Sequence, residues 1–443
     1  MANSRQRLRR RSAQAKSLLV GIVALAVLVL SPWWLLVALL LVFAGWMSAS
    51  RLGRQAWSVT QVGIATLPQR FGAASVVVVG IAGVVGVLVA LLAMGAGFAT
   101  TLRQSGTDDT LIVMRAGAQT ELNSVLDHDS ATLVAQAPQV LRNAHGQPIA
   151  SAELVVVAAL PKRSNGLDAN VELRGVSERS WELRPNVKII AGRRFVPGLR
   201  ELIVGKAAHQ QFAGVDLGST LKLNGQIWTV VGEFDSDDAF GSELWADSDV
   251  VAPTYRRGSS STSVTVRLTT VAAADAYKAG LASDPRLTVD AKTTRAYYTD
   301  QSASISQLIR VLGITIAAIM GVGAVFGALN TMYAAVATRA REIATLRAIG
   351  FRAAPVIISV LLETMLLALL GGVLGAAIAW LLFDHYTAST LGSNFTQVVF
   401  AFEVSPGLLW TGLTWALAIG LIGGLFPALR AAYLPVTAGL REL

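Results

Sequence analysis

The chain has 443 residues, of which 53% are hydrophobic and only 15% charged, and its mean hydropathy is +0.54. Soluble domains carry about a quarter charged residues, so the composition argues against an ordinary soluble protein and favours a membrane protein. The net charge of +9 does not indicate nucleic-acid binding, because residues 101–300 hold 21 basic and 23 acidic side chains. The basic excess lies beside apolar segments, as in loops on the cytoplasmic side of a membrane. The lack of cysteine excludes disulfides and cysteine-ligated metals.

The N-terminal region begins with a strongly basic segment, residues 1–16, that we expect to be cytoplasmic. The apolar residues 17–47 follow, and one helix of that length would measure about 46 Å, longer than the bilayer core of about 30 Å. Pro32 would break this helix, and the tryptophans that follow it suit a membrane interface. We therefore predict a membrane hairpin over 17–47 and an interfacial helix over 48–70. A single span and a cleaved signal peptide are the alternatives.

Four further apolar runs are long enough to cross a bilayer as helices. We predict these core membrane helices over residues 71–100, 304–336, 355–383 and 407–429. Arginines precede the first helix, separate the second from the third, and follow the fourth, so these ends belong in the cytoplasm. The cytoplasmic segments are then 337–354 and the tail 430–443, whereas residues 101–303 and the loop 384–406 are extracytoplasmic.

Residues 101–303 have the pattern of an α/β domain that can bury its own core. Strands are predicted at Thr110–Met114, Glu153–Ala159, Val171–Val176, Leu217–Leu223, Ile227–Phe234 and Ser263–Leu268. Helices are predicted over Glu201–Phe212 and Val271–Ala282. A break near residues 235–262 leaves both a single domain and two lobes open.

No motif in the chain indicates catalysis. Gly205–Lys206 is not followed by Ser or Thr, so a phosphate-binding loop is missing, and the four histidines are scattered. The acidic stretch DSDDAFGSELWADSD, residues 235–249, lacks the spacing of an EF-hand, and we expect a solvated surface loop there rather than a cation site. We therefore assign no catalytic, cofactor-binding or metal-binding residue to this chain.

The predicted membrane helices contain few polar residues, which argues against an aqueous pore. Asn330 and Glu363 are the exceptions. Glu363 lies about 12 Å into its helix, where a carboxylate is costly and is usually paired or functional. A proton relay would need further titratable groups at that depth. We therefore expect Glu363 to pair with the basic segment 337–354 or with a neighbouring helix.

The segment ATRAREIATLRAIGFRAAP, residues 337–355, has the pattern of a short amphipathic helix between two spans. Its apolar residues near one face are Val336, Ile343, Leu346 and Ile349. Arg339 and Glu342 can pair at i, i+3 spacing, and Gly350 is suited to end the helix. Such a helix could lie on anionic headgroups. A rigid docking element that receives the motion of a partner is the second interpretation, and it also explains why a formed helix is needed.

Three stretches of the chain resemble the MacB/FtsX-like ABC permeases: residues 330–352, 427–443 and 192–234. Glu363 and Gly371–Gly372 also stand where that family tends to place Glu and Gly-Gly. The resemblance covers residues 60–443. The N-terminal hairpin departs from the usual four-span plan, and the ATPase domain that MacB carries on the same chain is absent from this sequence.

The resemblance implies the transmembrane permease subunit of an ABC-type exporter in the inner membrane. ATP and Mg²⁺ would be bound by a separate ATPase subunit, and the permease would be a homodimer or pseudo-dimer in lipid. Motion of the extracytoplasmic domain would act on a periplasmic adaptor protein or cargo, which is efflux by mechanotransmission. The resemblance places a coupling helix at residues 337–354. Its candidate coupling residues are Arg339, Arg341, Glu342, Ile343, Leu346, Arg347 and Gly350.

Two other classes of function make different demands on the sequence. An FtsX-like signalling subunit that controls a cell-wall hydrolase is the alternative, although the central block is long for that role. A secondary transporter would need inverted repeats and broken helices with charged midplane sites, and the sequence shows neither.

Overall fold

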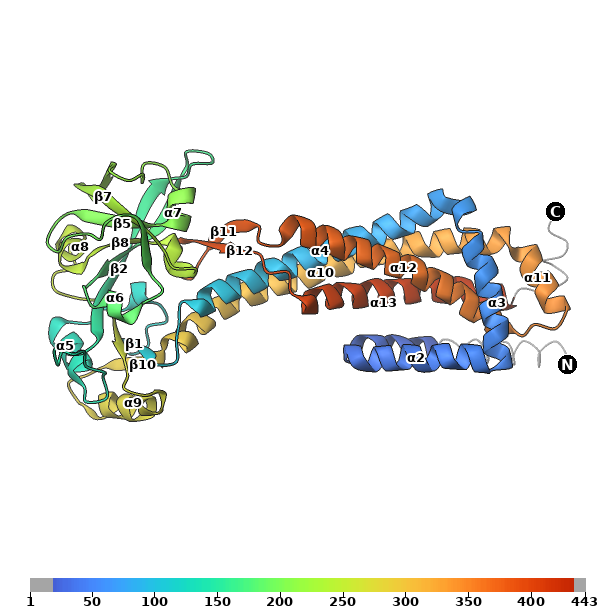
Figure 1. The fold of residues 1–443 in the computed structure, drawn as a ribbon, viewed down its shortest axis with the longest axis horizontal. Helices are drawn as coiled ribbons and strands as arrows, with labels where there is room; N and C mark the ends of the chain where they lie inside the picture. The colour runs from blue at the N-terminus through green and yellow to red at the C-terminus, as the bar shows by residue number, and fades with distance from the viewer. Residues whose placement is uncertain (1–18, 434–443) are drawn as a thin grey trace. The chain divides into compact units, whose positions relative to one another are not determined.

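The computed structural model describes residues 19–433, which form two compact units (Figure 1). The helical unit consists of residues 19–93, 309–384 and 403–433, and the sheet unit consists of residues 94–308 and 385–402. The predicted basic segment 1–16 and most of the predicted tail 430–443 lie outside the described residues.

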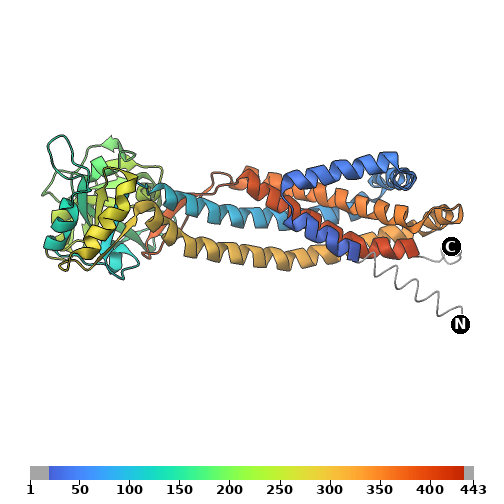
Figure 2. The same cartoon turned by 90° about the horizontal axis from the view of Figure 1, so that it is seen from below.

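Within residues 19–433, four helices are long and apolar enough to cross a membrane, so this is a multi-pass membrane protein. Figure 2 shows the helical unit from a second side. The four helices are η1–α4 (Pro68–Arg70 and Phe71–Gln104), α10 (Thr294–Thr338), α12 (Ala353–Phe383) and α13 (Pro406–Tyr433). α10 begins ten residues before the predicted start at residue 304. Its first turns are polar and give no apolar run, but Tyr297 and Tyr298 are buried in the sheet unit, and this burial supports helix there.

Glycines let these helices pack closely, as small residues do in membrane proteins. A side chain at Gly371 or Gly375 of α12 would collide with backbone carbonyl groups of α4. A side chain at Gly420 of α13 would collide with Ala368 of α12. The helical unit therefore depends on close backbone contacts among α4, α12 and α13.

The N-terminal helices break at Pro32, as predicted. A helix over Leu19–Leu30 ends before Pro32, and α2 (Trp33–Ala49) follows it. α3 (Arg51–Ala65) then turns by 97° relative to α2, and Ser50 caps it by accepting a hydrogen bond from the Gly53 amide. Helices of 12 and 17 residues measure about 18 and 26 Å, less than a full bilayer core, so the membrane hairpin over 17–47 stays a prediction.

The sheet unit contains a ten-stranded mixed sheet in the order β10-β1-β9-β2-β3-β8-β5-β7-β4, with β6 beside β7. β3 pairs in parallel with β8 and β5 pairs in parallel with β7, and the other pairs are antiparallel. The strands are β1 (Thr110–Arg115), β2 (Ala150–Pro161), β3 (Asp168–Val176), β4 (Lys188–Gly192), β5 (Glu201–Gly205), β6 (Thr220–Leu223), β7 (Gln226–Asp235), β8 (Leu244–Asp247), β9 (Ser263–Arg267) and β10 (Val289–Thr293). The helices are η2 (Glu121–Asn123), α5 (His128–Gln136), α6 (Ser180–Leu183), α7 (Lys206–Gln211), η3 (Ala239–Ser242), α8 (Ser248–Thr254), η4 (Val271–Ala273) and α9 (Ala274–Ser283).

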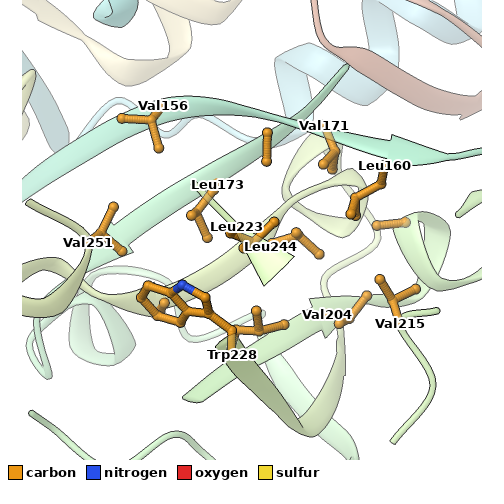
Figure 3. Close-up of a cluster of buried hydrophobic side chains, with 14 of the residues drawn as sticks. Val156, Leu160, Val171, Leu173, Val204, Val215, Leu223, Trp228, Leu244 and Val251 are labelled. Carbon is orange, nitrogen blue, oxygen red and sulfur yellow. The ribbon is translucent and has the colours of Figure 1, made fainter. Parts of the chain in front are cut away.

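This sheet carries two hydrophobic cores. One core joins β1, β9 and β10 to α5 and α9. The other surrounds Trp228 of β7, which lies among Leu173, Leu223, Leu244 and Val251 (Figure 3). Because β8 and α8 help to build the second core, residues 235–262 are not a boundary between two lobes.

The predicted helix over Glu201–Phe212 is wrong in its first half. Residues Glu201–Gly205 form β5, and only Lys206–Gln211 form helix α7. β5 lies between β7 and β8, with Leu202, Ile203 and Val204 all buried. A strand buried on both faces has a continuous apolar run, which sequence periodicity does not distinguish from a buried helix.

The expectation of a solvated loop at residues 235–249 is also wrong. This stretch forms η3 and β8, and Trp245 is fully buried there. Three of its acidic side chains, those of Asp238, Glu243 and Asp247, are buried. Asp238 accepts hydrogen bonds from Ser236, from Asn186 and from the Phe240 amide. Burial raises the pKa of Asp238 to about 6, and these hydrogen bonds oppose part of the rise.

The predicted loop 384–406 contains a hairpin of two strands, β11 (Thr387–Leu391) and β12 (Gln397–Ala401). The hairpin connects α12 to α13 along the chain, but it belongs to the sheet unit. Buried and half-buried residues alternate along β12, because one face of the strand lies against the domain.

Candidate functional site

The segment between the second and third core spans folds as a separate short helix, α11 (Ala340–Ala348), after a break at Arg339. At its C-terminal end the Phe351 amide donates to the Leu346 carbonyl at 3.1 Å, and the Gly350 amide donates to the Arg347 carbonyl at 3.2 Å. This is a Schellman motif, and Gly350 takes the positive φ of +106° that it requires. The predicted end of the helix at Gly350 is confirmed.

One face of α11 packs onto the ends of the membrane helices. Ile343 is buried with Val336 of α10, Val356 of α12 and Ala428 of α13. The other candidate coupling residues are half-buried (Arg339, Leu346, Arg347) or exposed (Arg341, Glu342, Gly350). The interpretation that Ile349 shares the buried face is wrong: Ile349 is 70% exposed, because the helix ends at Ala348 and the chain turns away from the helical spacing.

A buried carboxylate of α12 lies next to the first residues of α11. Glu363 of α12 is 2% exposed, and its two oxygens accept from Arg70 of η1 at 2.9 Å and from Arg339 at 3.3 Å. Arg339 also pairs with Glu342 at 3.2 Å. The expected pairing of Glu363 with the basic segment and the expected i, i+3 pair are both confirmed. We call Arg70, Arg339, Glu342 and Glu363 the coupling cluster.

The coupling cluster joins four segments. Arg70 also donates to Thr66, just after α3, at 3.0 Å. A side chain at Gly63 of α3 would reach within 3.0 Å of the Glu363 carboxylate and 3.1 Å of the Arg339 guanidinium, so α3 lies directly against these ion pairs. Sequence reasoning missed Arg70 and Gly63 as members of the site. Small residues at helical spacing in α3, namely Gly53, Ala56, Thr60 and Gly63, were the available signal for a packed face.

An apolar cavity of about 210 Å³ lies beside the coupling cluster, between the ends of α4, α10 and α12. Ala73, Met332 and Leu367 line it, with Arg70 and Glu363 at its edge. Apolar surroundings strengthen the attraction between opposite charges, so these ion pairs are held more firmly than pairs at a surface. Asn330, the other predicted polar residue of the spans, is exposed on α10 and does not join the cluster.

The cluster contains guanidinium and carboxylate groups that neutralise one another. Within residues 19–433, no group of three His, Asp or Glu side chains is arranged to hold a metal ion. The ion pairs hold α11 against η1, α12 and the end of α3.

Two family models match this chain. The MacB-like periplasmic core domain matches residues 73–283, and the C-terminal domain of FtsX-like permeases matches residues 314–436. The chain belongs to the MacB/FtsX-like permease family. Within this family match, α11 and Glu363 lie in the FtsX-like region, and the sheet unit lies mainly in the MacB-like region.

Curated relatives of this permease include macrolide export ATP-binding/permease proteins MacB. That of Neisseria gonorrhoeae is 27% identical over 313 residues, covering 64% of this chain and 46% of the relative. That of Campylobacter jejuni is 32% identical over 117 residues, covering 26% of this chain and 17% of the relative. The chain spans less than half the length of these curated relatives.

Solved structures with some similarity are extracytoplasmic regions. The periplasmic region of MacB from Actinobacillus actinomycetemcomitans gives 14% identity and a TM-score of 0.33, over 45% of this chain and 92% of that one. The extracellular domain of the noncanonic ABC-type transporter YknZ from Gram-positive bacteria gives 16% identity and a TM-score of 0.30, over 38% of this chain and 88% of that one.

Proposed function

We propose that this chain is the transmembrane permease subunit of an ABC-type exporter in the inner membrane, and that α11 is the helix on which a separate ATPase subunit docks. The observation that carries the proposal is the construction of α11. It is a short helix with a defined end, with Ile343 packed into the spans and Arg341 exposed on another face. A basic loop that only contacts headgroups would need neither the packed face nor the ion pairs.

The coupling cluster gives a route for movement from α11 into the spans. Displacement of α11 would pull on α12 through the Arg339–Glu363 pair and on the start of α4 through the Glu363–Arg70 pair. α4 and α10 each continue as one helix beyond the helical unit, past residues 93 and 309. Helical continuity would carry that movement toward the sheet unit better than a flexible linker.

In this proposal, ATP and Mg²⁺ are bound by the partner subunit, and the permease works as a homodimer or pseudo-dimer. Movement of the sheet unit outside the membrane would act on a periplasmic adaptor protein or on cargo. Membership of the permease family supports the general role, and the packing of α11 supports its part in coupling.

The proposal predicts that reversing charge on α11 uncouples the ATPase subunit. We expect the double variant Arg341→Glu/Arg347→Glu to reduce co-purification with the ATPase, or ATP turnover stimulated by the permease, at least tenfold. Expression, dimerisation and elution as a single species should be unchanged.

The matched control is Arg51→Glu/Arg54→Glu, which changes the charge equally at two exposed arginines of α3. It should bind and stimulate the ATPase like the wild type. If the α11 variant also behaves like the wild type, docking on α11 is wrong and the headgroup interpretation stands. If both variants lose ATPase binding or stimulation to the same extent, the effect comes from the net charge of the cytoplasmic side and not from α11.

A further inference from the structure

The β11–β12 hairpin is fastened to the sheet unit by side chains from several elements. The Val399 amide donates to Ser242 of η3 at 2.9 Å, and Asn170 of β3 donates to the Phe395 carbonyl at 3.1 Å. Phe400 of β12 packs edge to face on Phe98 of α4, with ring centroids 5.5 Å apart. In the chain the hairpin lies between α12, which ends at Phe383, and α13, which begins at Pro406.

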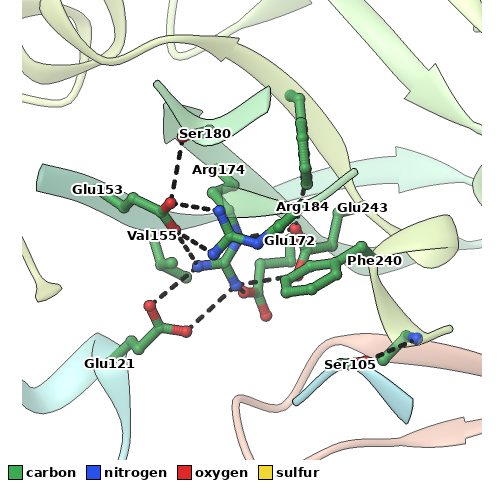
Figure 4. A network of polar contacts seen from close by, with 12 residues as sticks. Ser105, Glu121, Glu153, Val155, Glu172, Arg174, Ser180, Arg184, Phe240 and Glu243 are labelled. Atoms are coloured by element: carbon green, nitrogen blue, oxygen red, sulfur yellow. Dashed lines mark hydrogen bonds and ion pairs between the residues drawn. The ribbon is translucent and has the colours of Figure 1, made fainter. Parts of the chain in front are cut away.

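A buried network of charges lies next to the loop of the hairpin. Figure 4 shows the side chains of this network. Arg174 of β3 is at its centre, and its guanidinium donates to carboxylates from four other positions at 2.8–3.1 Å. These carboxylates belong to Glu121, Glu153, Glu172 and Glu243, and a second guanidinium, that of Arg184, pairs with Glu153. All six residues are buried. Tyr297 and Tyr298 of α10 pack around the same network as uncharged groups.

The charges of this network do not balance if every group is ionised, since four carboxylates face two guanidinium groups. Excess negative charge inside a protein is costly, and protonation of a carboxyl is the usual relief. Glu153 is not the protonated carboxyl, because the attraction of Arg184 and Arg174 outweighs the effect of burial and lowers the pKa of Glu153. Glu172 accepts one hydrogen bond from Arg174, whereas Glu121 and Glu243 each accept two. Burial and then the nearby Glu243 carboxylate raise the pKa of Glu172 to about 8, although Arg174 opposes the rise.

Glu172 is also the member of the network that contacts the hairpin. One of its oxygens accepts from Asn394 at 3.0 Å and from Thr396 at 3.3 Å. Among the residues that the structure describes, no donor reaches the buried Asn394 Oδ1. Flipping the Asn394 side-chain amide by about 180° would place Oδ1 next to Glu172. A protonated Glu172 carboxyl would then donate a hydrogen bond to this oxygen. A cavity of about 40 Å³ between Glu172, Arg174 and the hairpin loop leaves room for about one water.

We propose that Glu172 carries a proton while the hairpin is seated on the domain, and that loss of this proton to solvent accompanies release of the hairpin. Lifting the hairpin would expose the Glu172 carboxyl to water and remove the burial that keeps it neutral. Release and ionisation are therefore linked, and release becomes easier as the pH rises toward about 8, by up to about tenfold per pH unit. Above that pH the effect stops, because Glu172 is ionised in both states. This inference rests on the sheet unit alone and is independent of the proposed function.

Hydrogen exchange of the full chain in lipid nanodiscs tests the inference, with rates corrected for the intrinsic effect of pH. The readout is the peptide that contains the Val399 amide, which Ser242 holds against the domain. In the wild type we expect its protection to fall at least tenfold between pH 6 and 8 and then to level off. A peptide from β7 should keep its protection throughout, because the hairpin moves and the core does not.

Two variants define the role of the carboxyl. Glu172→Gln keeps the shape and stays neutral, so the protection of its hairpin should not depend on pH. The control Glu201→Gln removes a carboxylate that pairs with Arg193 at the surface of the same domain, and it should keep the wild-type profile. A wild-type profile that is flat, or a Glu172→Gln profile that follows the wild type, overturns the proposal.

Thr396→Val provides a second test that does not require Glu172→Gln to fold. The Thr396 hydroxyl donates to Glu172 and so favours the ionised carboxylate in the seated state. Its removal should therefore move the pH at which protection levels off upward. An unchanged or lower levelling pH contradicts the assignment to Glu172.

Discussion

Glu363 shows how a carboxylate is accommodated among apolar helices. It is 2% exposed and placed between two guanidinium groups, and one of these, Arg339, is shared with the half-exposed Glu342. Removing one partner of a buried ion pair leaves uncompensated charge, whereas removing an exposed partner has little effect. The two carboxylates on Arg339 are therefore expected to differ strongly in their contribution to stability.

We predict that Glu363→Ala destabilises the folded protein by about 3 kcal/mol, because Arg70 and Arg339 lose their common partner. Glu342→Ala removes the other carboxylate from Arg339 and should cost less than about 1 kcal/mol. Thermal unfolding of the purified protein in one detergent measures both. Equal losses for the two variants would show that burial of Glu363 does not decide its contribution.

Sequence reasoning found part of the coupling cluster. The spacing of Arg339 and Glu342 on one helix predicts their pairing, and the high cost of a lone carboxylate predicts that Glu363 has a partner. Arg70 and Gly63 were not predicted, because their positions depend on how α3 and α4 pack against α12. Ile349 was misplaced, because spacing within a helix says nothing of residues after its end.

At the scale of elements, sheet formation explains both what was predicted and what was missed. Strands with an exposed face alternate in hydrophobicity, as in β7, where Trp228 and Phe234 are buried and Ile227 is exposed. β5 and β8 are buried on both faces and lack this alternation. Glu243, which directly precedes β8, has the sequence surroundings of a surface loop, because its buried partner Arg174 is 69 residues away in the sequence.

Neighbouring residues of β7 provide a test of this core. Trp228→Ala should destabilise the sheet unit by about 3–5 kcal/mol, because it empties the centre of the core. Ile227→Ala changes the adjacent side chain, which is 67% exposed, and should change stability by about 0.5 kcal/mol at most. Thermal unfolding of the full chain, monitored by the susceptibility of the sheet unit to proteolysis, distinguishes the two variants. A similar effect of both substitutions would mean that Trp228 does not anchor this core.

At the scale of the whole molecule, composition and charge predicted the four apolar spans and an α/β insertion, since both depend on long stretches of the chain. The assignment of the β11–β12 hairpin to the sheet unit was not predicted. Residues 384–406 form a short connection between two spans, and only contacts with distant residues such as Asn170 and Glu172 place the hairpin.

The predicted topology can be tested by cysteine labelling, because the chain contains no cysteine of its own. A cysteine at Leu167, which is 67% exposed in the sheet unit, should react with a membrane-impermeant reagent added outside cells. A cysteine at Ile349, which is 70% exposed after α11, should react only after the membrane is opened, and a cysteine at Ala13 should behave in the same way. Outside labelling at Ile349 would reverse the orientation, and outside labelling at Ala13 alone would exclude the N-terminal hairpin.

The position of the hairpin has a consequence for biosynthesis. Glu172 and its partner Asn394 are separated by 222 residues, and Asn394 leaves the ribosome only after three of the four core spans have been made. The strands of the large sheet are complete by residue 293, so the domain can fold before its last piece exists. During that interval the hairpin does not yet cover Glu172, and under the proposed linkage Glu172 takes up its proton only when the hairpin arrives. Maturation of this permease therefore ends with docking of the hairpin on the domain. A nascent chain arrested before residue 394 should carry a folded domain without its docked hairpin.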